Sequence, residues 1–535
     1  MGLWFVREIF TDQERARLAP HFTNLEGPVF ALTNLPEVVK GAMFARYSRT
    51  PKSLRRLFLD EFAEPLEAGE VGGIEGVKVD KAEQLFDRVF FEFGDDSVAQ
   101  LGGVHLACEQ SSQLLAKALE WGRLAAYLEQ STRYMRYDSR PGGRWRATVP
   151  PEIVDTQLEE RYVELLDDVF TTYGRMYDVL DAWYRERFPQ EPEDSDFVYR
   201  QTILAKTCDT LRMILPAGTR SNLGIYATGQ SYEQLLMRLA QHPLAEMREY
   251  GDLMKVELRK VIPEFLKRVD VDDRGVAWSG YWRDVRERTQ ELAAKLTGDI
   301  QPEPREEVNL VDHDPEGELK ITAAVLYGAS DLPDDQLLEL VRRMEYDQRD
   351  AVLAASIGSR TNRRHKPGRA WERTQYRFDI LCDFGAFRDL QRHRPLTIEW
   401  QRLSPSFGYE LPGDVEAAGL RAEWERLMER SKETHDQIAA GGLLDAAQYA
   451  VAMGYRIRFT MQMTAREAMH LVELRSQPQG HRTYRRVAQA IHQQIEAVHP
   501  AIGEAFTFMS YDDVGLERLE AERRTERKRG LVEPG

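Results

Sequence analysis

Residues that could bind a phosphorylated ligand gather in three short segments of this 535-residue chain. The first segment, Tyr127–Tyr134, reads YLEQSTRY. In an extended strand, Glu129, Ser131 and Arg133 would point to one face at intervals of about 7 Å. A carboxylate, a hydroxyl and a guanidinium in a row could hold a phosphate and the polar edge of a ring. The solvent face of an edge strand would show the same pattern, and the sequence leaves that alternative open.

The second segment, QRHRP, places Arg392 and Arg394 on either side of His393. Pro395 ends any preceding helix, and arginines two residues apart share a face only where the backbone is extended. Such a turn could clamp a pyrophosphate, because the guanidinium fork matches phosphate oxygens. A charged helix C-terminus, stabilised by the helix dipole, is the alternative.

The third segment, TAREAMHLVELR, has the spacing of an amphipathic helix. Arg466 and His470, four residues apart, would share one face of this helix. Arg475 would lie about 140° around the helix from His470 and would therefore serve a different contact. An ordinary surface helix would show the same pattern.

Composition restricts the classes of function that such segments could serve. The net charge is −16 and the dense basic run ERRTERKRG is confined to the tail, which we interpret as a solvated terminus, so we expect no nucleic-acid partner. No stretch approaches the roughly 18 apolar residues of a membrane helix, and the start lacks a signal-peptide pattern, so we expect no membrane partner and a cytoplasmic location. Cys108, Cys208 and Cys382 are far apart, which predicts buried thiols and no metal site.

The elements that would position these segments are mostly helical. Apolar residues recur at three- and four-residue steps from Pro151 to Phe188, which predicts one long helix. Further helices are expected over 232–268, 335–357, 414–449 and 463–475. The acidic, proline-containing segment 297–316 is predicted to be a linker between domains at 1–296 and 317–535.

A weak internal repeat relates these two parts. Each contains a strand-like run, a helix and an arginine-containing turn: VHLAC, EQSSQLLAKALE and WGR in the first, YRFDILC, DFGAFRDLQ and RHR in the second. The sequence offset between the turns is 394 − 123 = 271, and that between the later helices ending at Arg238 and Arg475 is 475 − 238 = 237. The first part would therefore hold an insertion (271 − 237 = 34), predicted in its long helical region. One supersecondary unit can recur by chance, so the pattern alone leaves the repeat a hypothesis.

Together the three segments resemble the flavin-dependent thymidylate synthases, the ThyX family. That family is marked by RHR running into a strand SxNExSxRY, then ARxxLP, then a helix ending in LR. In the first half, Tyr127–Tyr134 matches the strand and LRMILP supplies Arg212, but Leu128 replaces the Asn and WGR replaces RHR.

The second half departs from the family pattern in the opposite way. Its RHR is intact, and Arg466, His470 and Arg475 match the family's flavin- and substrate-contacting helix. Trp400 and Arg402, however, stand where the strand has Glu and Ser, and Gln448 replaces the ARxxLP arginine.

The resemblance implies an α+β fold of two tandem ThyX-like domains, each a mainly antiparallel sheet packed with long helices. It also implies one composite site, because the halves have lost different parts. Residues of the first half would bind dUMP: Glu129, Ser131, Arg133 and Arg212. Residues of the second half would bind FAD: Arg392, His393 and Arg394, with Arg466 and His470 near its ring. Arg475 or Arg238 would face the uracil as the catalytic group.

The implied reaction converts dUMP to dTMP with methylenetetrahydrofolate and NADPH. A homodimer would replace the family's four-subunit assembly. Two alternatives stay open: a degenerate homologue that binds flavin or nucleotide without turnover, and a related pyrimidine hydroxymethylase.

Overall fold

The computed structural model describes residues 7–48, 50–67 and 100–530. The chain divides into two compact units that exchange segments along the sequence. Unit 1 comprises residues 1–109, 124–129 and 222–300, and unit 2 comprises residues 110–123, 130–221 and 301–535. The boundaries 1–296, 297–316 and 317–535 rest on the composition of the predicted linker and remain a prediction. Within the predicted linker, Val308–His313 forms strand β4.

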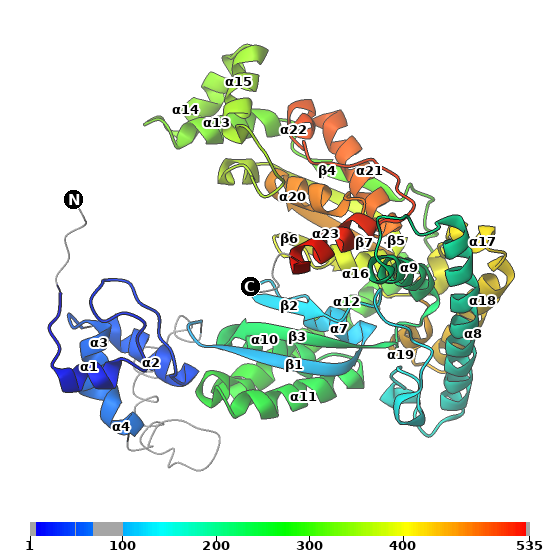
Figure 1. Cartoon of the computed structure of the whole chain (residues 1–535), viewed down its shortest axis with the longest axis horizontal. Helices are drawn as coiled ribbons and strands as arrows, with labels where there is room; N and C mark the ends of the chain where they lie inside the picture. Colours follow the sequence, from blue (N-terminus) through cyan, green and yellow to red (C-terminus); the bar gives the residue numbers. More distant parts are fainter. Residues whose placement is uncertain (1–6, 49, 68–99, 531–535) are drawn as a thin grey trace. The chain divides into compact units, whose positions relative to one another are not determined.

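A three-stranded sheet runs through unit 1 (Figure 1). Strand β3 (Arg220–Thr228) lies between β1 (Gly103–Ser112) and β2 (Ala125–Glu129). Strands β2 and β3 are antiparallel, and the last pair in their register is Glu129 with Leu223. Alternate side chains of β3 are buried, as expected for a sheet with one covered face.

Unit 1 also contains seven α-helices among its described residues. They are α1 (Asp12–Leu18), α2 (Glu37–Tyr47), α3 (Leu54–Leu57), α4 (Ala63–Glu67), α10 (Gly229–Ala240), α11 (Ala245–Arg259) and α12 (Ala277–Thr297). The helix predicted over 232–268 is thus interrupted, and Pro243 lies in the break.

Unit 2 contains a four-stranded antiparallel sheet in the order β4-β5-β7-β6. Strand β5 (Gln375–Asp383) pairs along its whole length with β7 (Arg456–Thr464), and β6 (Leu396–Trp400) pairs with the other edge of β7. Buried side chains alternate along β5 and β7, which places the core on one face of these strands.

Helices also make up most of unit 2. Before strand β5 come α7 (Gln113–Leu119), α8 (Gln157–Arg187), α9 (Asp196–Leu211), α13 (Gly317–Tyr327), α14 (Asp334–Arg343) and α15 (Tyr346–Ile357). After β5 come α16 (Phe384–Leu390), α17 (Gly413–Ala417), α18 (Arg421–Ala440), α19 (Leu444–Ala447), α20 (Ala465–Arg475), α21 (Arg482–Val498), α22 (Pro500–Glu504) and α23 (Leu519–Gly530). The long helix predicted from Pro151 to Phe188 is α8. The basic tail, expected to be a solvated terminus, forms most of α23, in which residues 524–528 are exposed and Arg523 pairs with Asp194 at 2.6 Å.

The same order of elements occurs twice, as β1-α7-β2-α8-β3-α10 and as β5-α16-β6-α18-β7-α20. In each sheet the third strand of the set lies between the first two. The sequence offset between the N-caps Ser112 and Asp383 is 383 − 112 = 271, and that between the N-caps Thr228 and Thr464 is 464 − 228 = 236. The first copy therefore holds an insertion (271 − 236 = 35) in the stretch that forms α8 and α9. The α+β fold of two tandem copies is confirmed.

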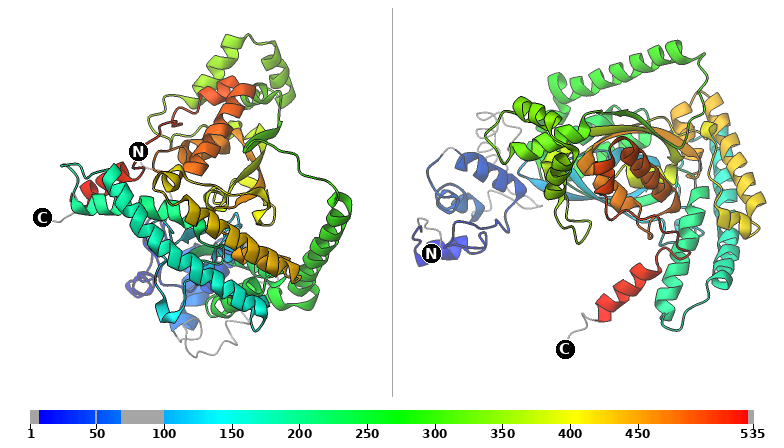
Figure 2. Two further views of the ribbon diagram at one scale, coloured as in Figure 1. Left: turned by 90° about the vertical axis from the view of Figure 1, so that its right-hand side faces the viewer. Right: turned by 90° about the horizontal axis from the view of Figure 1, so that it is seen from above.

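Matching parts of the two copies meet inside unit 2. Helices α8 and α18 lie side by side (Figure 2), with Arg426 paired to Asp168 at 2.5 Å. The segments 213–218 and 449–454 also exchange backbone hydrogen bonds, since Ala217 N donates to Val451 O at 2.8 Å and Met453 N donates to Leu215 O at 2.9 Å. Unit 2 thus contains the α8 region of the first copy and the α18 region of the second.

Two further expectations concern burial and membranes. Cys108, Cys208 and Cys382 are buried free thiols, as predicted. Across the described ranges, no helix is long and apolar enough to span a bilayer.

Candidate nucleotide site

Four arginines and two aspartates from both copies converge in unit 2. We call this group the arginine cluster, and its members are Arg133, Arg212, Arg392, Arg475, Asp209 and Asp389. Its formal charge is 4 − 2 = +2. Arg133, Asp209 and Arg212 come from the first copy, and the others come from the second.

The ends of four elements position these side chains. Arg133 lies in the turn after β2, and Arg212 directly follows α9. Asp389 lies in the last turn of α16, and Arg475 ends α20. Long side chains at the ends of helices and strands can reach one another, while packing holds the helices and strands in place.

Asp209 joins the first-copy arginines to helix α21. Its Oδ1 lies 2.9 Å from Arg133 Nε, and its Oδ2 lies 2.8 Å from His481 Nδ1. Burial alone would raise the pKa of Asp209, but Arg133 and His481 lower it well below its usual range. The same carboxylate raises the pKa of His481 against the opposing effect of burial. Asp209 is therefore a fixed anion in the cluster.

Asp389 is the second anion. It pairs with Arg392, and its Oδ2 accepts from Arg133 Nη2 at 3.2 Å. Burial would raise the pKa of Asp389, but Arg392, Arg133 and Arg475 lower it well below its usual range. The carboxylate holds together arginines that would otherwise repel one another.

Arg212 has unused hydrogen-bonding capacity. Arg212 is only 3% exposed, and its Nε and Nη2 make no hydrogen bond among the described residues. Nε lies 3.1 Å from Asp209 Oδ1, a charge contact without the angles of a hydrogen bond, and Nη2 lies 3.8 Å from Asp389 Oδ2. Burial lowers the pKa of Arg212, which reflects the cost of an incompletely paired buried cation. An anionic ligand would remove that cost.

An aromatic ring completes the cluster. The guanidinium groups of Arg475 and Arg133 lie 5.3 and 5.6 Å from the ring centre of Tyr484. These distances permit cation–π attraction. Tyr484 thus stabilises two arginines of opposite copies without neutralising either.

Open space borders the cluster. A cavity of about 540 Å³ is lined by Asp209 and His481, together with residues of α9, the start of α21 and the segment 513–517. This volume lies in the range of small-molecule pockets. Its lining mixes acidic and basic groups, for example Lys206 with Glu517 at 2.8 Å.

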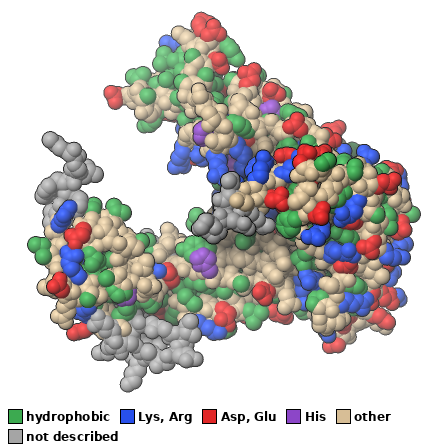
Figure 3. Space-filling view, in the orientation of Figure 1, with side chains coloured by type: hydrophobic (Ala, Val, Ile, Leu, Met, Phe, Trp, Pro, Cys, Tyr) green, Lys and Arg blue, Asp and Glu red, His purple; other side chains and the backbone are tan. Residues whose placement is uncertain are grey.

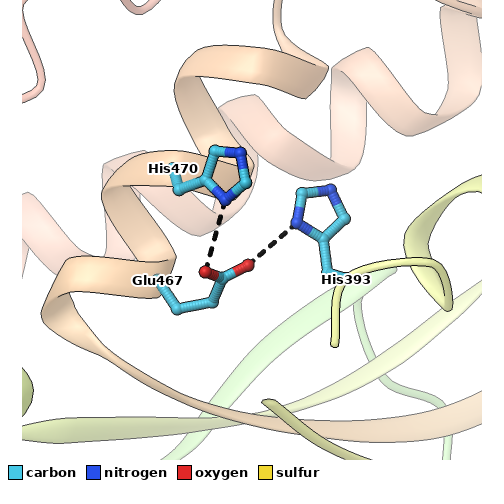
Figure 4. A group of neighbouring side chains, drawn as sticks. All are labelled: His393, Glu467 and His470. Carbon is cyan, nitrogen blue, oxygen red and sulfur yellow. Dashed lines mark hydrogen bonds and ion pairs between the residues drawn. The ribbon is translucent and has the colours of Figure 1, made fainter. Parts of the chain in front are cut away.

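A second polar group lies beside Arg475. His393 Nδ1 is 2.9 Å from Glu467 Oε1, and His470 Nδ1 is 3.3 Å from Glu467 Oε2 (Figure 4). Arg475 Nε donates to His393 Nε2 at 2.9 Å. Burial is the main cause that lowers the pKa of His393 to about 4, and hydrogen bonds from both histidines lower that of Glu467 to about 2 against burial. His393 is therefore neutral and Glu467 ionised at neutral pH.

Arg394 and Arg466 lie outside the arginine cluster. Arg394 is exposed, as is Arg392, while His393 between them is buried, in keeping with the predicted extended turn. Arg466 Nε donates to Pro367 O at 2.9 Å. Arg466 and Arg363 both act to lower the pKa of Lys366, although burial lowers it most. In Figure 3, Lys and Arg side chains gather near α20, which makes this surface suitable for an anion.

The predicted row of Glu129, Ser131 and Arg133 on one strand face is wrong. Strand β2 ends at Glu129, where its register with β3 also ends. Ser131 Oγ accepts from Arg133 N at 3.3 Å, and this local bond favours a turn over a continued strand. The structure brings Arg133 to the cluster, whereas Ser131 is exposed in the turn and Glu129 belongs to unit 1.

Arg238 is not the structural counterpart of Arg475. Its offset from the N-cap Thr228 is 238 − 228 = 10, whereas the offset of Arg475 from Thr464 is 475 − 464 = 11. A shift by a single position turns a side chain about 100° around the helix. Arg238 belongs to unit 1, where burial lowers its pKa against the influence of Tyr127.

The sequence interpretation missed the groups that orient the arginines: Asp209, Asp389, Glu467, Tyr484 and His481. Asp209, Asp389 and Glu467 had a usable signal, since each lies three residues before a predicted site residue: Arg212, Arg392 or His470. That spacing places the two side chains on one helix face.

Comparison with known proteins identifies the family of the chain. The family described as "Thymidylate synthase complementing protein" (Thy1) matches residues 42–264 and 309–501, one segment in each copy. A UPF0159 protein from Chlamydia muridarum is 37% identical over 96% of this chain and 98% of its own length. Another from Thermoplasma acidophilum is 28% identical over 92% and 99%, respectively.

Shorter proteins match part of the chain. A flavin-dependent thymidylate synthase from Clostridium tetani is 22% identical over 36% of this chain and 75% of that protein. A crystal structure of the UMP/dUMP methylase PolB from Streptomyces cacaoi, bound with 5-Br dUMP, covers 39% of this chain and 96% of its own, at 18% identity and a TM-score of 0.30. With family matches in both copies and a relative of the same length, the chain belongs to the thymidylate synthase complementing protein (Thy1, ThyX) family as a tandem duplication.

Proposed function

We propose that this protein is an FAD-dependent thymidylate synthase that converts dUMP to dTMP at one composite site per chain. The observation that supports it most is the convergence of Arg133 and Arg212 from the first copy with Arg392 and Arg475 from the second. Neither copy alone contains these four groups.

The charge of the arginine cluster suits a nucleotide monophosphate. Its formal charge of 4 − 2 = +2 complements a phosphate dianion. We assign the phosphate to Arg133 and Arg212, because Arg212 has two donors without acceptors. Ser131 would add a contact to the phosphate or sugar, as the family resemblance implies, whereas the role of Glu129 stays a prediction.

Residues suited to FAD include Arg392 of the arginine cluster and residues beside the cluster. Arg392 and Arg394 offer exposed guanidinium groups for a pyrophosphate, and Arg466 adds to the positive surface near α20. His393 and His470 would lie near the flavin ring. Bound FAD would supply the reducing chemistry.

The chain's own contribution is positioning and charge. Arg475 would stabilise negative charge on the uracil ring when its C5 reacts. By family resemblance, methylenetetrahydrofolate supplies the one-carbon unit and NADPH the electrons, so that dTMP, tetrahydrofolate and NADP⁺ are the products. No protein nucleophile is needed in this scheme.

The test combines flavin binding with turnover. The purified protein should take up FAD and release tritium from dUMP labelled at C5 when methylenetetrahydrofolate and NADPH are present. Arg133→Ala should abolish release, whereas Arg402→Ala should not. FAD and dUMP binding without release would favour the degenerate homologue, and a hydroxymethylated product would favour the hydroxymethylase. A protein that binds neither ligand would contradict the proposal.

We also propose a homodimer, because two tandem chains supply the four copies that the family assembles from four subunits. Light scattering should then give twice the chain mass of 61.7 kDa. A monomer with full activity would contradict this assembly.

A further inference from the structure

A continuous hydrogen-bonded chain leads from His470 to the arginine cluster. It runs from His470 to Glu467, from Glu467 to His393, and from His393 to Arg475, with successive distances of 3.3, 2.9 and 2.9 Å. Arg475 Nη2 then donates to the backbone oxygen of Asp389 at 2.5 Å. Glu467 and His393 are buried, so water does not compete strongly for these bonds.

The chemistry of arginine fixes the direction of each bond. A guanidinium only donates, so His393 Nε2 must accept from Arg475. A neutral imidazole with an accepting Nε2 carries its proton on Nδ1. That proton faces Glu467 Oε1, and the ionised carboxylate accepts it. Glu467 therefore favours the one neutral tautomer of His393 that can hold Arg475.

We propose that Glu467 is a positioning residue of the nucleotide site: it holds His393 in the Nδ1-protonated tautomer, and His393 in turn fixes the guanidinium of Arg475 toward the uracil. The role at uracil rests on the proposed function, whereas the tautomer does not. Glu467 itself touches neither ligand in this scheme. Its effect on binding passes through His393 and Arg475.

A shared metal ion is the competing explanation for the same side chains. The ligand atoms of His393, Glu467 and His470 lie within 4.8 Å of one another. A metal on His393 Nδ1, however, would leave the ring proton on Nε2. That N–H would then face the N–H of Arg475, and the observed 2.9 Å contact would become repulsive.

Other charged groups lie near this series of hydrogen bonds, and their effects agree with a hydrogen-bonding role for Glu467. Arg475 acts to lower the pKa of His393, as does His470, while Glu467 raises it. Lys366 lies near enough to Glu467 for the carboxylate to raise its pKa against burial. Glu467 thus neutralises a surrounding excess of positive charge.

The experiment compares three variants in the full-length protein with FAD added. Glu467→Leu removes the acceptor, and Glu467→Gln keeps an amide oxygen that can accept from His393 Nδ1. Glu473→Gln is the matched control, because Glu473 is a buried acid on the same helix that pairs with Arg360 at 2.5 Å. Histidine is labelled with ¹⁵N, and His393→Gln identifies the signals of that ring.

Wild type and Glu467→Gln should show His393 protonated on Nδ1 at pH 7.5. Glu467→Leu should shift that ring toward the other tautomer and weaken dUMP binding about tenfold, the effect of one lost charge-assisted hydrogen bond. Glu473→Gln should leave the His393 signals unchanged even if it lowers stability. Calorimetry with dUMP measures the affinities.

Three results would overturn the proposal. They are a wild-type His393 that is charged or Nε2-protonated, a Glu467→Leu variant with unchanged tautomer and affinity, and His393 signals that change when EDTA is added, which would indicate a metal. If wild type binds no dUMP, the proposed function fails, and the tautomer signals still decide whether Glu467 positions His393.

Discussion

Asp209 and Asp445 occupy equivalent places in the two copies, at the same sequence offset as the later N-caps (445 − 209 = 236), but their surroundings differ. Asp209 binds Arg133 at 2.9 Å and His481 at 2.8 Å, within the arginine cluster. Asp445 binds Arg402 at 2.9 Å. The two equivalent carboxylates thus differ in role. Asp209 pairs with several charged groups, whereas Asp445 pairs with Arg402.

The remaining positions differ more strongly. At an offset of 271, Asp389, Arg392 and His393 correspond to Ala118, Trp121 and Gly122. Trp121 packs edge-on against Trp400 with ring centres 5.6 Å apart. We call this pair the tryptophan contact. Aromatic packing has replaced charge in the counterpart region.

Gln448, the counterpart of Arg212, shows the same change. Its Oε1 accepts from the backbone N–H of Leu403 at 3.1 Å, so the side chain supports a loop. Arg212, by contrast, keeps buried donors without acceptors. The comparison teaches that duplication let one region keep the binding groups while the other became structural.

The largest expected effect comes from removing cluster arginines. Arg133→Ala and Arg475→Ala should each weaken dUMP binding about a hundredfold, since each loses charged hydrogen bonds of roughly 2–3 kcal/mol. Arg402→Ala, the matched change in the counterpart region, should alter the affinity less than about twofold. Titration calorimetry measures all three. Equal losses in Arg133→Ala and Arg402→Ala would break the comparison.

Acid should destabilise the charged region through His393, which has no counterpart because Gly122 occupies the equivalent position. The pKa of His393 is lowered to about 4 in the folded protein from 6.5, so the unfolded chain binds more protons between these values. Stability is therefore fully present above pH 6.5 and falls as the pH drops toward 4. The loss should reach about 3 kcal/mol.

His393→Gln should flatten this decline between pH 6.5 and 4, as measured by urea unfolding at each pH. Titration of His481, whose pKa is raised, acts in the opposite direction and is common to both proteins. An unchanged pH profile in the variant would mean that His393 does not titrate as described.

A change in the tryptophan contact should have the opposite effect to a change in the arginine cluster: it should affect stability and not ligand binding. Trp400→Ala should lower the free energy of unfolding by about 1.5 kcal/mol, because it removes aromatic packing with Trp121 and Phe387. It should leave dUMP affinity unchanged. Urea unfolding and calorimetry on the same preparation separate the two effects, and a loss of affinity would show that the counterpart region also binds ligand.

The smallest expected effect is one that the two copies share. Thr228 and Thr464 both cap the helix that follows the central strand, through a side chain that accepts a backbone N–H. Thr228→Ala and Thr464→Ala should each cost about 1 kcal/mol of stability. A markedly unequal cost, seen in urea unfolding, would show that the copies differ in scaffold as well as in site.

The sequence predicted the parts of the fold that depend on local pattern. Apolar spacing located α8, and the strand–helix–arginine pattern located the two copies. Short segments named Arg133, Arg392 and Arg475, and the family resemblance named Arg212. Such features follow from periodicity and residue type, which a single chain displays directly.

Other features depend on contacts between distant residues and could not be read from the sequence. Local pattern favoured a strand through Arg133, but the bond between Ser131 and the Arg133 backbone ended it. Glu467 looks like any acid on a helix surface until His393, far earlier in the chain, is placed against it. The match of Arg238 with Arg475 failed by one position because only the N-caps fix the helix register.

The central claim is that each chain keeps one nucleotide site, built from both copies. The most direct measurement is the stoichiometry of dUMP binding to the FAD-loaded protein by titration calorimetry. One dUMP per chain is predicted, with the saturable heat lost in both Arg133→Ala and Arg475→Ala at the same ligand concentrations. Two dUMP per chain, or one that survives both changes, would contradict the account.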